Sequence, residues 1–444
     1  MAANLRPILS LLIGVALLLA GAGLQITLLP LRGNVEGFGT FALGAIGSAY
    51  YLGFVSGCFA GPYVILRAGH IRAFAALVAV ATAAVLSYSL APDPVAWAVF
   101  RAITGFSLAG FYLVIESWLN DRASNQTRGF VMSAYIAVNL AALAAGQMLV
   151  SLYPVEGFQS FLLAGILIAL AIVPVALTRS AQPAPITIVR FRPWQLYEAA
   201  PVSLVACFMI GVTNGAFWAL GPVSVGGVGL SVTEVAAFMS IAVVGGALAQ
   251  YPVGRFSDRM DRRLVLLAVL IGATAISLVL WTFAPTGSVL VVCGFLLGAL
   301  MLPGYSLAAA HGYDKTVHSD MVPTAATMLL ANGLGSVIGP LVAASMMNGL
   351  GPRALFLFTA IGSALLAGFV FYRTTVQAPV AQPEKTDFDL ATTAQVGVVV
   401  ATDELDPADE NVAVPDSQET REGRVDAPLA PDGGDGDGTP RGSF

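Results

Sequence analysis

The stretch that decides the fold of this chain reads Gly254-Arg255-Phe256-Ser257-Asp258-Arg259-Met260-Asp261-Arg262-Arg263, and it separates two very apolar segments. Its first glycine has a counterpart in Gly61, and the two residue numbers differ by 193. A chance match would not keep one register over so much of the chain, so we predict two halves that share one architecture. The same difference of 193 separates five further pairs, namely Gly105 and Gly298, Tyr112 and Tyr305, Asp121 and Asp314, Asn139 and Asn332, and Gly146 and Gly339.

The composition excludes a soluble globular protein. Hydrophobic residues make up 57% of the 444 residues and charged residues only 11%, whereas about 25% of a typical soluble domain is charged. A helix needs about 20 mostly apolar residues to cross a bilayer. Runs of that length predict an all-α membrane protein with twelve transmembrane helices in two six-helix bundles. The predicted spans are Ile8–Leu31, Thr40–Leu66, Ala73–Leu90, Val95–Leu119, Gly129–Leu152, Phe161–Leu177, Pro201–Pro222, Val232–Val253, Leu264–Pro285, Ser288–Ala310, Thr324–Asn348 and Ala354–Tyr372.

These spans divide the chain into four predicted parts. Residues 1–178 form the N-terminal six-helix bundle, 179–200 a cytoplasmic linker, 201–372 the C-terminal six-helix bundle, and 373–444 a cytoplasmic tail. The tail holds fifteen Asp and Glu residues against five Lys and Arg residues. Such a segment buries too little apolar surface to offset the entropy of ordering. We therefore predict that the acidic tail is disordered.

The basic residues predict the orientation in the membrane. The positive-inside rule places loops rich in Lys and Arg in the cytoplasm. With a cytoplasmic amino terminus, the opposite side holds only Arg32 and Arg353, and both termini are cytoplasmic. The first segment continues to about residue 31, longer than the apolar core of a signal peptide, so we expect it to be an uncleaved helix of the cytoplasmic (inner) membrane. The residues on the predicted cytoplasmic side are Arg6, Arg67, Arg72, Arg122, Arg128, Arg179, Arg190, Arg192, Arg255, Arg259, Arg262, Arg263 and Lys315.

Several motifs resemble one known family. The loop Gly254–Arg263 is similar to the G-x-x-x-D-R-x-x-R-R signature of the major facilitator superfamily, and Arg101 with Gly105 resembles its R-x-x-x-G motif. The string Glu116-Ser117-Trp118-Leu119-Asn120 and the segment Leu302–His311 resemble a YcaD-like, uncharacterised branch of that family. The resemblance covers about residues 8–372. It implies the major facilitator fold and a role in membrane transport, and it implies little about the substrate.

The loop motif has the chemistry of a gating contact, although an ordinary basic cytoplasmic loop is the alternative. Gly254 lets two helices approach closely, Asp258 can sit at a helix N-terminus, and the arginines can pair with carboxylates on neighbouring helix ends. The corresponding positions of the first half, Ile65 and Leu66, lack the acid, so Arg67 or Arg72 would need another partner. We predict Glu116 for that role and leave open whether it is a gating residue or a proton carrier. The predicted gating residues are Arg67, Arg72, Glu116, Gly254, Asp258, Arg259, Arg262 and Arg263.

The resemblance also predicts which segments line a substrate pathway. Segments one, four, seven and ten line the cavity of this fold, and segments five and eleven contribute to it. A charge inside a membrane helix suggests function, whereas Arg101 could alternatively extend its charge toward the membrane surface. The asparagines suit a neutral or zwitterionic solute, although each could instead bridge two helices. The predicted pathway residues are Gln25, Arg101, Asn139, Gln147, Asn214, Trp218, Tyr305 and Asn332.

These observations predict a secondary active transporter that moves a small organic solute by alternating access. Internally duplicated membrane proteins of this kind bind their substrate between the repeats, and the chain has no phosphate-binding loop, so an ion or solute gradient must supply the energy. The sequence leaves proton coupling and uniport open. It also leaves open a transporter-like sensor or receptor, and an amphiphile or drug efflux protein or lipid flippase.

Other classes of protein find no support. The three histidines, His70, His311 and His318, have no plausible nucleophile partner, so no enzyme is predicted. The three cysteines lie inside apolar segments without metal-ligand spacing, and no cofactor or metal is expected. The small number of basic residues and the acidic tail argue against a protein that binds nucleic acid. We expect one chain to work alone, with the lipid bilayer and the solute as its partners.

Overall fold

The computed structural model describes residues 2–123, 127–177, 191–317 and 320–376, and the described chain is helical. The predicted tail from residue 377 onward and most of the predicted linker lie outside these residues. The helices of the first half are α1 (Ala2–Val35), α2 (Thr40–Ala68), α3 (His70–Ser87), α4 (Pro94–Arg122), α5 (Arg128–Met148), the 3-10 helix η1 (Leu149–Leu152), α6 (Gln159–Leu170) and α7 (Ile172–Ala176). Those of the second half are α8 (Pro193–Ala199), α9 (Pro201–Gly226), α10 (Val232–Arg259), α11 (Arg262–Phe283), α12 (Gly287–Tyr313), α13 (Met321–Leu350) and α14 (Ala354–Val376).

Twelve helices in the described chain are long and apolar enough to cross a membrane, which confirms the predicted number. Each predicted span coincides with one of them, and α6 and α7 together make one span from Gln159 to Ala176. The connection between α11 and α12 is short. Ala284 there has a left-handed φ of 45° and Gly287 a φ of 59°, so the chain reverses within three residues.

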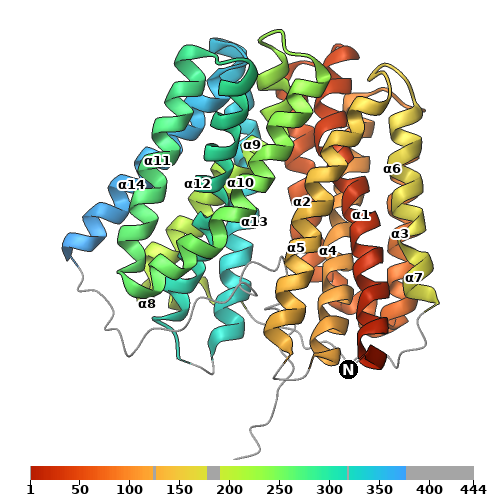
Figure 1. Ribbon diagram of the computed structural model, residues 1–444, viewed down its shortest axis with the longest axis horizontal. Helices are drawn as coiled ribbons and strands as arrows, with labels where there is room; N and C mark the ends of the chain where they lie inside the picture. Colours follow the sequence, from red (N-terminus) through yellow and green to blue (C-terminus); the bar gives the residue numbers. More distant parts are fainter. Residues whose placement is uncertain (1, 124–126, 178–190, 318–319, 377–444) are drawn as a thin grey trace, which may run out of the picture. The chain divides into compact units, whose positions relative to one another are not determined.

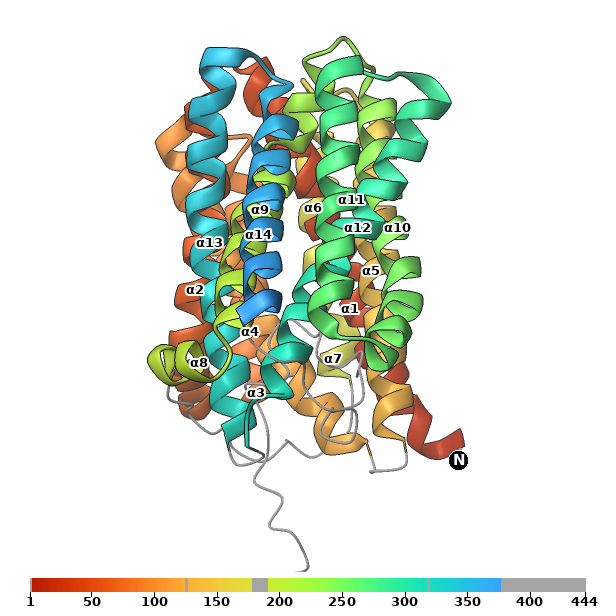
Figure 2. The same ribbon diagram turned by 90° about the vertical axis from the view of Figure 1, so that its left-hand side faces the viewer.

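The twelve spans form the two predicted six-helix bundles. Figure 1 shows α1 to α7 in one bundle and α9 to α14 in the other, and Figure 2 shows the same arrangement after a rotation of 90°. Helix α1 begins, and α14 ends, on the same side of the bundles, which is the lower side of Figure 1. We call this side the terminal side and the opposite side the far side. The exact limits of the four predicted parts remain predictions.

Two of the three glycine pairs that are matched across the repeat lie where helices cross in contact. A Cβ added to Gly105 of α4 would collide with the backbone oxygen of Tyr50 on α2. In the second half, a Cβ on Gly298 of α12 would collide in the same way with Ala242 on α10. The matched glycines of α5 and α13 behave likewise against α1 and α9. Only glycine permits so close an approach of two backbones, which explains why the repeat is preserved in glycines.

The two bundles are in close contact on the far side. The pairs of helices that meet are mainly α2 with α13, α5 with α10, and α9 with both α2 and α1. On the far side, Ser240 of α10 donates a hydrogen bond of 2.9 Å to the backbone oxygen of Ala144 on α5. A Cβ on Gly44 of α2 would lie 2.6 Å from that of Ala344 on α13. The two bundles are therefore closely packed at this side.

Candidate functional site

A cavity of about 280 Å³ lies between the two bundles. Its walls come from α1, α2, α4 and α5 of the first bundle and from α9, α10, α12 and α13 of the second. The resemblance predicted six of these eight helices, and the structure adds α2 and α10. The lining residues are Leu19, Ala22, Ile26, Gly47, Tyr50, Tyr51, Arg101, Leu108, Tyr112, Ile136, Asn139, Leu140, Leu143, Asn214, Gly215, Trp218, Ala219, Gln250, Leu302, Tyr305, Ser306, Leu329, Asn332 and Ser336.

Six of the eight predicted pathway residues line this cavity. The structure does not place Gln25 and Gln147 among its lining residues. Gln25 is 3% exposed and donates a hydrogen bond of 3.2 Å to the backbone oxygen of Gly21, one turn earlier in α1. Gln147 is fully buried, and its backbone nitrogen lies beside Gly23 of α1. Gln147 therefore belongs to the contact between α1 and α5, whereas the hydrogen bond of Gln25 stays within α1. The six residues in the cavity wall are Arg101, Asn139, Asn214, Trp218, Tyr305 and Asn332.

Arg101 contributes a positive charge to the cavity wall. Its guanidinium carbon lies 4.3 Å from the centre of the Tyr50 ring, which is the geometry of a cation–π contact. Asp93, two turns earlier, caps the start of α4 by accepting hydrogen bonds from the backbone nitrogens of the first turn. The helix thus begins on the far side and carries Arg101 two turns inward, where it lines the cavity.

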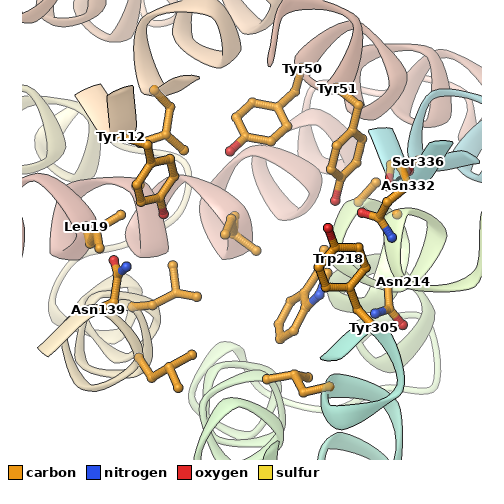
Figure 3. Close-up of a pocket in the computed structure, with 18 of the residues that line it drawn as sticks. Leu19, Tyr50, Tyr51, Tyr112, Asn139, Asn214, Trp218, Tyr305, Asn332 and Ser336 are labelled. Atoms are coloured by element: carbon orange, nitrogen blue, oxygen red, sulfur yellow. Dashed lines mark hydrogen bonds between the residues drawn. The ribbon is translucent and has the colours of Figure 1, made fainter. Parts of the chain in front are cut away.

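The wall is rich in aromatic residues, some of which are not among the predicted pathway residues. Figure 3 shows Tyr50, Tyr51 and Tyr112 with their rings directed into the cavity from the first bundle, and Trp218 and Tyr305 facing them from the second. Tyr112 could have been found, because it is matched with Tyr305 across the repeat. The Tyr50-Tyr51 pair gave no such signal, since it lies in a segment that was not expected to line the cavity.

The asparagines of the wall occupy two kinds of position. The side-chain nitrogen of Asn332 donates a hydrogen bond of 3.1 Å to the backbone oxygen of Cys207, so this residue bridges α13 and α9. In the described chain, the buried side-chain oxygen of Asn139 accepts no hydrogen bond. Figure 3 places Asn139 on the opposite side of the cavity from Asn214 and Asn332. The side chain of Asn139 therefore lines the cavity, while its oxygen is buried and has no hydrogen-bond donor among the described residues.

The arginines of the loop motif form ion pairs at the terminal side. Arg262 donates a hydrogen bond of 2.7 Å to Asp314 at the end of α12, and both side chains are 1% exposed. Arg262 also lies 3.4 Å from Asp258 and bonds the hydroxyl of Ser257 at 2.9 Å. The pairing of a motif arginine with a carboxylate on a neighbouring helix end agrees with the expectation from the sequence. The structure thereby joins α10, α11 and α12 through one buried guanidinium.

The position expected for Asp258 was wrong. Asp258 lies in the last turn of α10 rather than at a helix N-terminus, and Asp261 caps α11 by accepting from the backbone nitrogen of Arg263. Asp258 and Asp261 lie three residues apart, and either could be the acid that caps the next helix. Because α10 continues to Arg259, only Asp261 is in the capping position. Partial burial raises the pKa of Asp261, but the hydrogen bonds and charge of Arg263 outweigh it and leave this pKa below its ordinary value. Gly254 is buried within α10, and Arg259 is exposed.

Glu116 lies in a different setting from the one predicted. It is fully buried within the first bundle and accepts a hydrogen bond of 2.9 Å from the hydroxyl of Tyr135 on α5. Arg67 and Arg72 are exposed, and the ion pairs among the described residues do not join either of them to Glu116. Glu116 was predicted as the partner of Arg67 or Arg72 from its charge alone. Charge does not specify the direction in which a side chain points.

The fold and the site together assign this chain to a class of proteins. It is an integral membrane protein whose two helical bundles enclose a partly polar central cavity. The chain belongs to the Major Facilitator Superfamily, whose family model matches residues 11–315 and 202–400. It is 27% identical over 357 residues to the uncharacterized MFS-type transporter YcaD of Escherichia fergusonii, which covers 80% of this chain and 92% of that protein. YcaD of Escherichia coli is 28% identical over 359 residues, with the same coverage. The predicted family and branch are both confirmed.

Solved structures support the same fold. The nucleoside transporter NupG superposes with a TM-score of 0.70 at 16% identity, over 82% of this chain and 98% of that one. A single-residue variant of the Escherichia coli fucose:proton symporter FucP superposes with a TM-score of 0.53 at 17% identity, over 84% of this chain and 99% of that one. At these identities the likeness is one of fold.

Proposed function

We propose that this protein is a secondary active transporter that moves a small organic solute across the cytoplasmic (inner) membrane by alternating access. The observation that carries the proposal is the cavity between the two bundles, which is lined from both halves of an internal repeat. A site in that position can be exposed to either side of the membrane when one bundle rocks against the other. The transporter relatives support the same function, and we propose no enzymatic reaction.

The contacts between the bundles support a state that is closed toward the far side. Gly47 of α2 packs closely against Ala219 of α9, and Leu31 of α1 would lie 3.3 Å from a Cβ on Gly226. Both contacts lie at the far end of the cavity. The asymmetry of basic residues favours cytoplasmic termini, so the terminal side would face the cytoplasm. A carrier that is closed on the far side is then in an inward-facing state. The gating residues at the terminal side would then close the cytoplasmic entrance in the outward-facing state.

The energy source is proposed to be an ion or solute gradient, with proton coupling centred on Glu116 as the first hypothesis. Tyr112 lines the cavity, and Glu116 follows one turn later on the same helix. Tyr135, which donates to Glu116, lies one turn before the cavity residue Asn139 on α5. Polar groups therefore lead from the cavity toward a buried carboxylate. Solved structures of the same fold include a nucleoside transporter and a fucose:proton symporter, and a polar solute with proton coupling is our corresponding proposal for this chain.

Flux through reconstituted protein tests the proposal. The purified full-length chain is placed in liposomes, and uptake from a library of radiolabelled metabolites is measured with and without a pH gradient. We expect gradient-dependent uptake of at least one compound, and loss of that uptake in Asn214→Ala. The matched control is Asn348→Ala, which removes the same amide near the end of α13, away from the cavity-lining residues.

Compounds that stabilise the protein without any flux would contradict transport and favour a sensor or receptor. Deletion of residues 380–444 separates these functions further, because a carrier keeps its flux whereas a sensor that signals through the tail loses its output. Movement of lipid analogues without uptake of any water-soluble compound would favour a flippase.

A further inference from the structure

The charges in the cavity wall are unbalanced. Among the 24 residues that line it, Arg101 alone is charged at neutral pH, and none is Asp, Glu or Lys. The ion pairs of the described chain do not include Arg101. Its guanidinium lies over the face of Tyr50, at 4.3 Å from the ring centre. The cavity therefore presents one positive charge to its contents, with no carboxylate in its lining.

The acids on the same helix are too distant to neutralise this arginine. Asp93 caps α4 with its carboxylate, and it precedes Arg101 by eight residues, about 12 Å along the axis. Glu116 follows Arg101 by fifteen residues, about 22 Å along the axis, and accepts from Tyr135. A charge in the membrane interior is costly and normally has a partner. A negatively charged solute would supply that partner at the point where the cavity lacks one.

The other residues of the wall indicate the shape and polarity of the rest of such a solute. Tyr50, Tyr51 and Tyr112 face Trp218 and Tyr305 across the cavity (Figure 3), so flat rings line both bundles. Aromatic side chains pack well against a planar apolar group, and their hydroxyl and indole groups can bond its polar edge. The volume of about 280 Å³ lies at the small end of typical ligand pockets, which are about 300–1,000 Å³. One or two fused rings with one acidic group would fit.

We propose that the cavity binds a small organic anion, a monocarboxylate with a planar apolar body, and that Arg101 binds its carboxylate. The arginine fork suits a carboxylate because it donates two parallel hydrogen bonds. The tyrosines hold the ring of the solute. The identity of the solute deepens the transport proposed above, but binding itself rests only on the cavity.

Matched pairs of compounds test the charge requirement directly. Calorimetric titration of the purified full-length protein compares benzoate with benzamide, and indole-3-acetate with indole-3-acetamide, at pH 7. Each pair has nearly the same shape and differs in one negative charge. Hydrogen bonds between charged groups are stronger than those between neutral groups. We therefore expect each carboxylate that binds to have an affinity about ten- to hundredfold higher than that of its amide. Equal or tighter binding of the amides, or binding of no carboxylate at all, would overturn the proposal.

Variants assign the preference to Arg101. In Arg101→Gln, the affinity for the carboxylate should fall to about the affinity for its amide. Arg101→Lys keeps the positive charge and should retain part of the preference for the carboxylate. Arg353→Gln removes one positive charge from the exposed far side and should leave the preference unchanged. A preference that survives in Arg101→Gln would also overturn the proposal. If carboxylates bind selectively but no gradient drives their flux, the binding proposal stands and the transport proposal fails.

Discussion

The buried ion pair between Arg262 and Asp314 provides a quantitative prediction. Both side chains are 1% exposed, and their hydrogen bond measures 2.7 Å. Asp314 follows the last turn of α12 as its C-cap, where the helix dipole disfavours a negative charge. Replacing Arg262 with Met removes the cation and leaves the carboxylate buried. We expect a loss of about 3–5 kcal/mol in the free energy of unfolding, the usual cost of breaking a buried pair.

An exposed pair of the same chemistry is the matched control. Arg192 and Asp320 lie 3.0 Å apart, but their side chains are 43% and 46% exposed. Water screens such a pair, so Arg192→Met should cost less than about 1 kcal/mol. The double variant with Arg262→Met and Asp314→Leu should recover much of the loss, because no unpaired charge is left in the interior.

Unfolding by sodium dodecyl sulfate in mixed micelles, followed by circular dichroism, measures all of these variants on one scale. Equal losses for Arg262→Met and Arg192→Met would refute the reasoning, because burial would then have no effect on the strength of the pair. A double variant no more stable than Arg262→Met alone would also contradict it.

Three further predictions follow from other contacts. Gly298→Val should cost about 1–3 kcal/mol by overpacking, because its side chain would meet the backbone of α10, whereas Gly349→Val meets nothing within 4 Å and should cost little; equal losses in the same unfolding assay would contradict this. Asp261 has a pKa below its ordinary 3.8, so its stabilising effect is complete above pH 3.8 and is lost as the pH falls through its lowered pKa. The destabilisation by Asp261→Asn should therefore shrink in acid, and a cost that grows in acid would disprove it. Glu116→Gln should abolish proton-driven accumulation in liposomes if Glu116 carries the proton, and accumulation that keeps its pH dependence would exclude that role.

The sequence predicts most of the fold because the bilayer imposes a simple rule. Each span needs about 20 apolar residues, and a charged or Pro/Gly-rich break such as Gly254–Arg263 shows where one span ends. The repeat adds an independent check, since Gly105 and Gly298 occupy equivalent helix crossings. These signals depend on local composition and on spacing, which are both visible in a single chain.

The site is less predictable because the direction of each side chain depends on how the helices are rotated. Gln25 and Gln147 are polar residues in the expected helices, yet Gln25 bonds within α1 and Gln147 lies in the contact between α1 and α5. Tyr50 and Tyr51 reach the cavity from α2, which the resemblance did not include. A tyrosine in an apolar segment looks the same in the sequence whether it faces lipid, a neighbouring helix or a cavity.

The rocking of the two bundles is the central claim, and two distances measured in one sample test it most directly. Spin labels are attached in pairs across the bundles after the three native cysteines are replaced. One pair, at the exposed residues Phe41 and Leu350, reports on the far side, and the other, at the exposed Leu66 and Phe256, reports on the terminal side. Electron–electron double resonance in lipid nanodiscs is recorded between pH 5 and 8 and with saturating indole-3-acetate. The account predicts two populations in each pair, with the far side widening as the terminal side narrows. A single unchanged distance in both pairs under all these conditions would contradict alternating access.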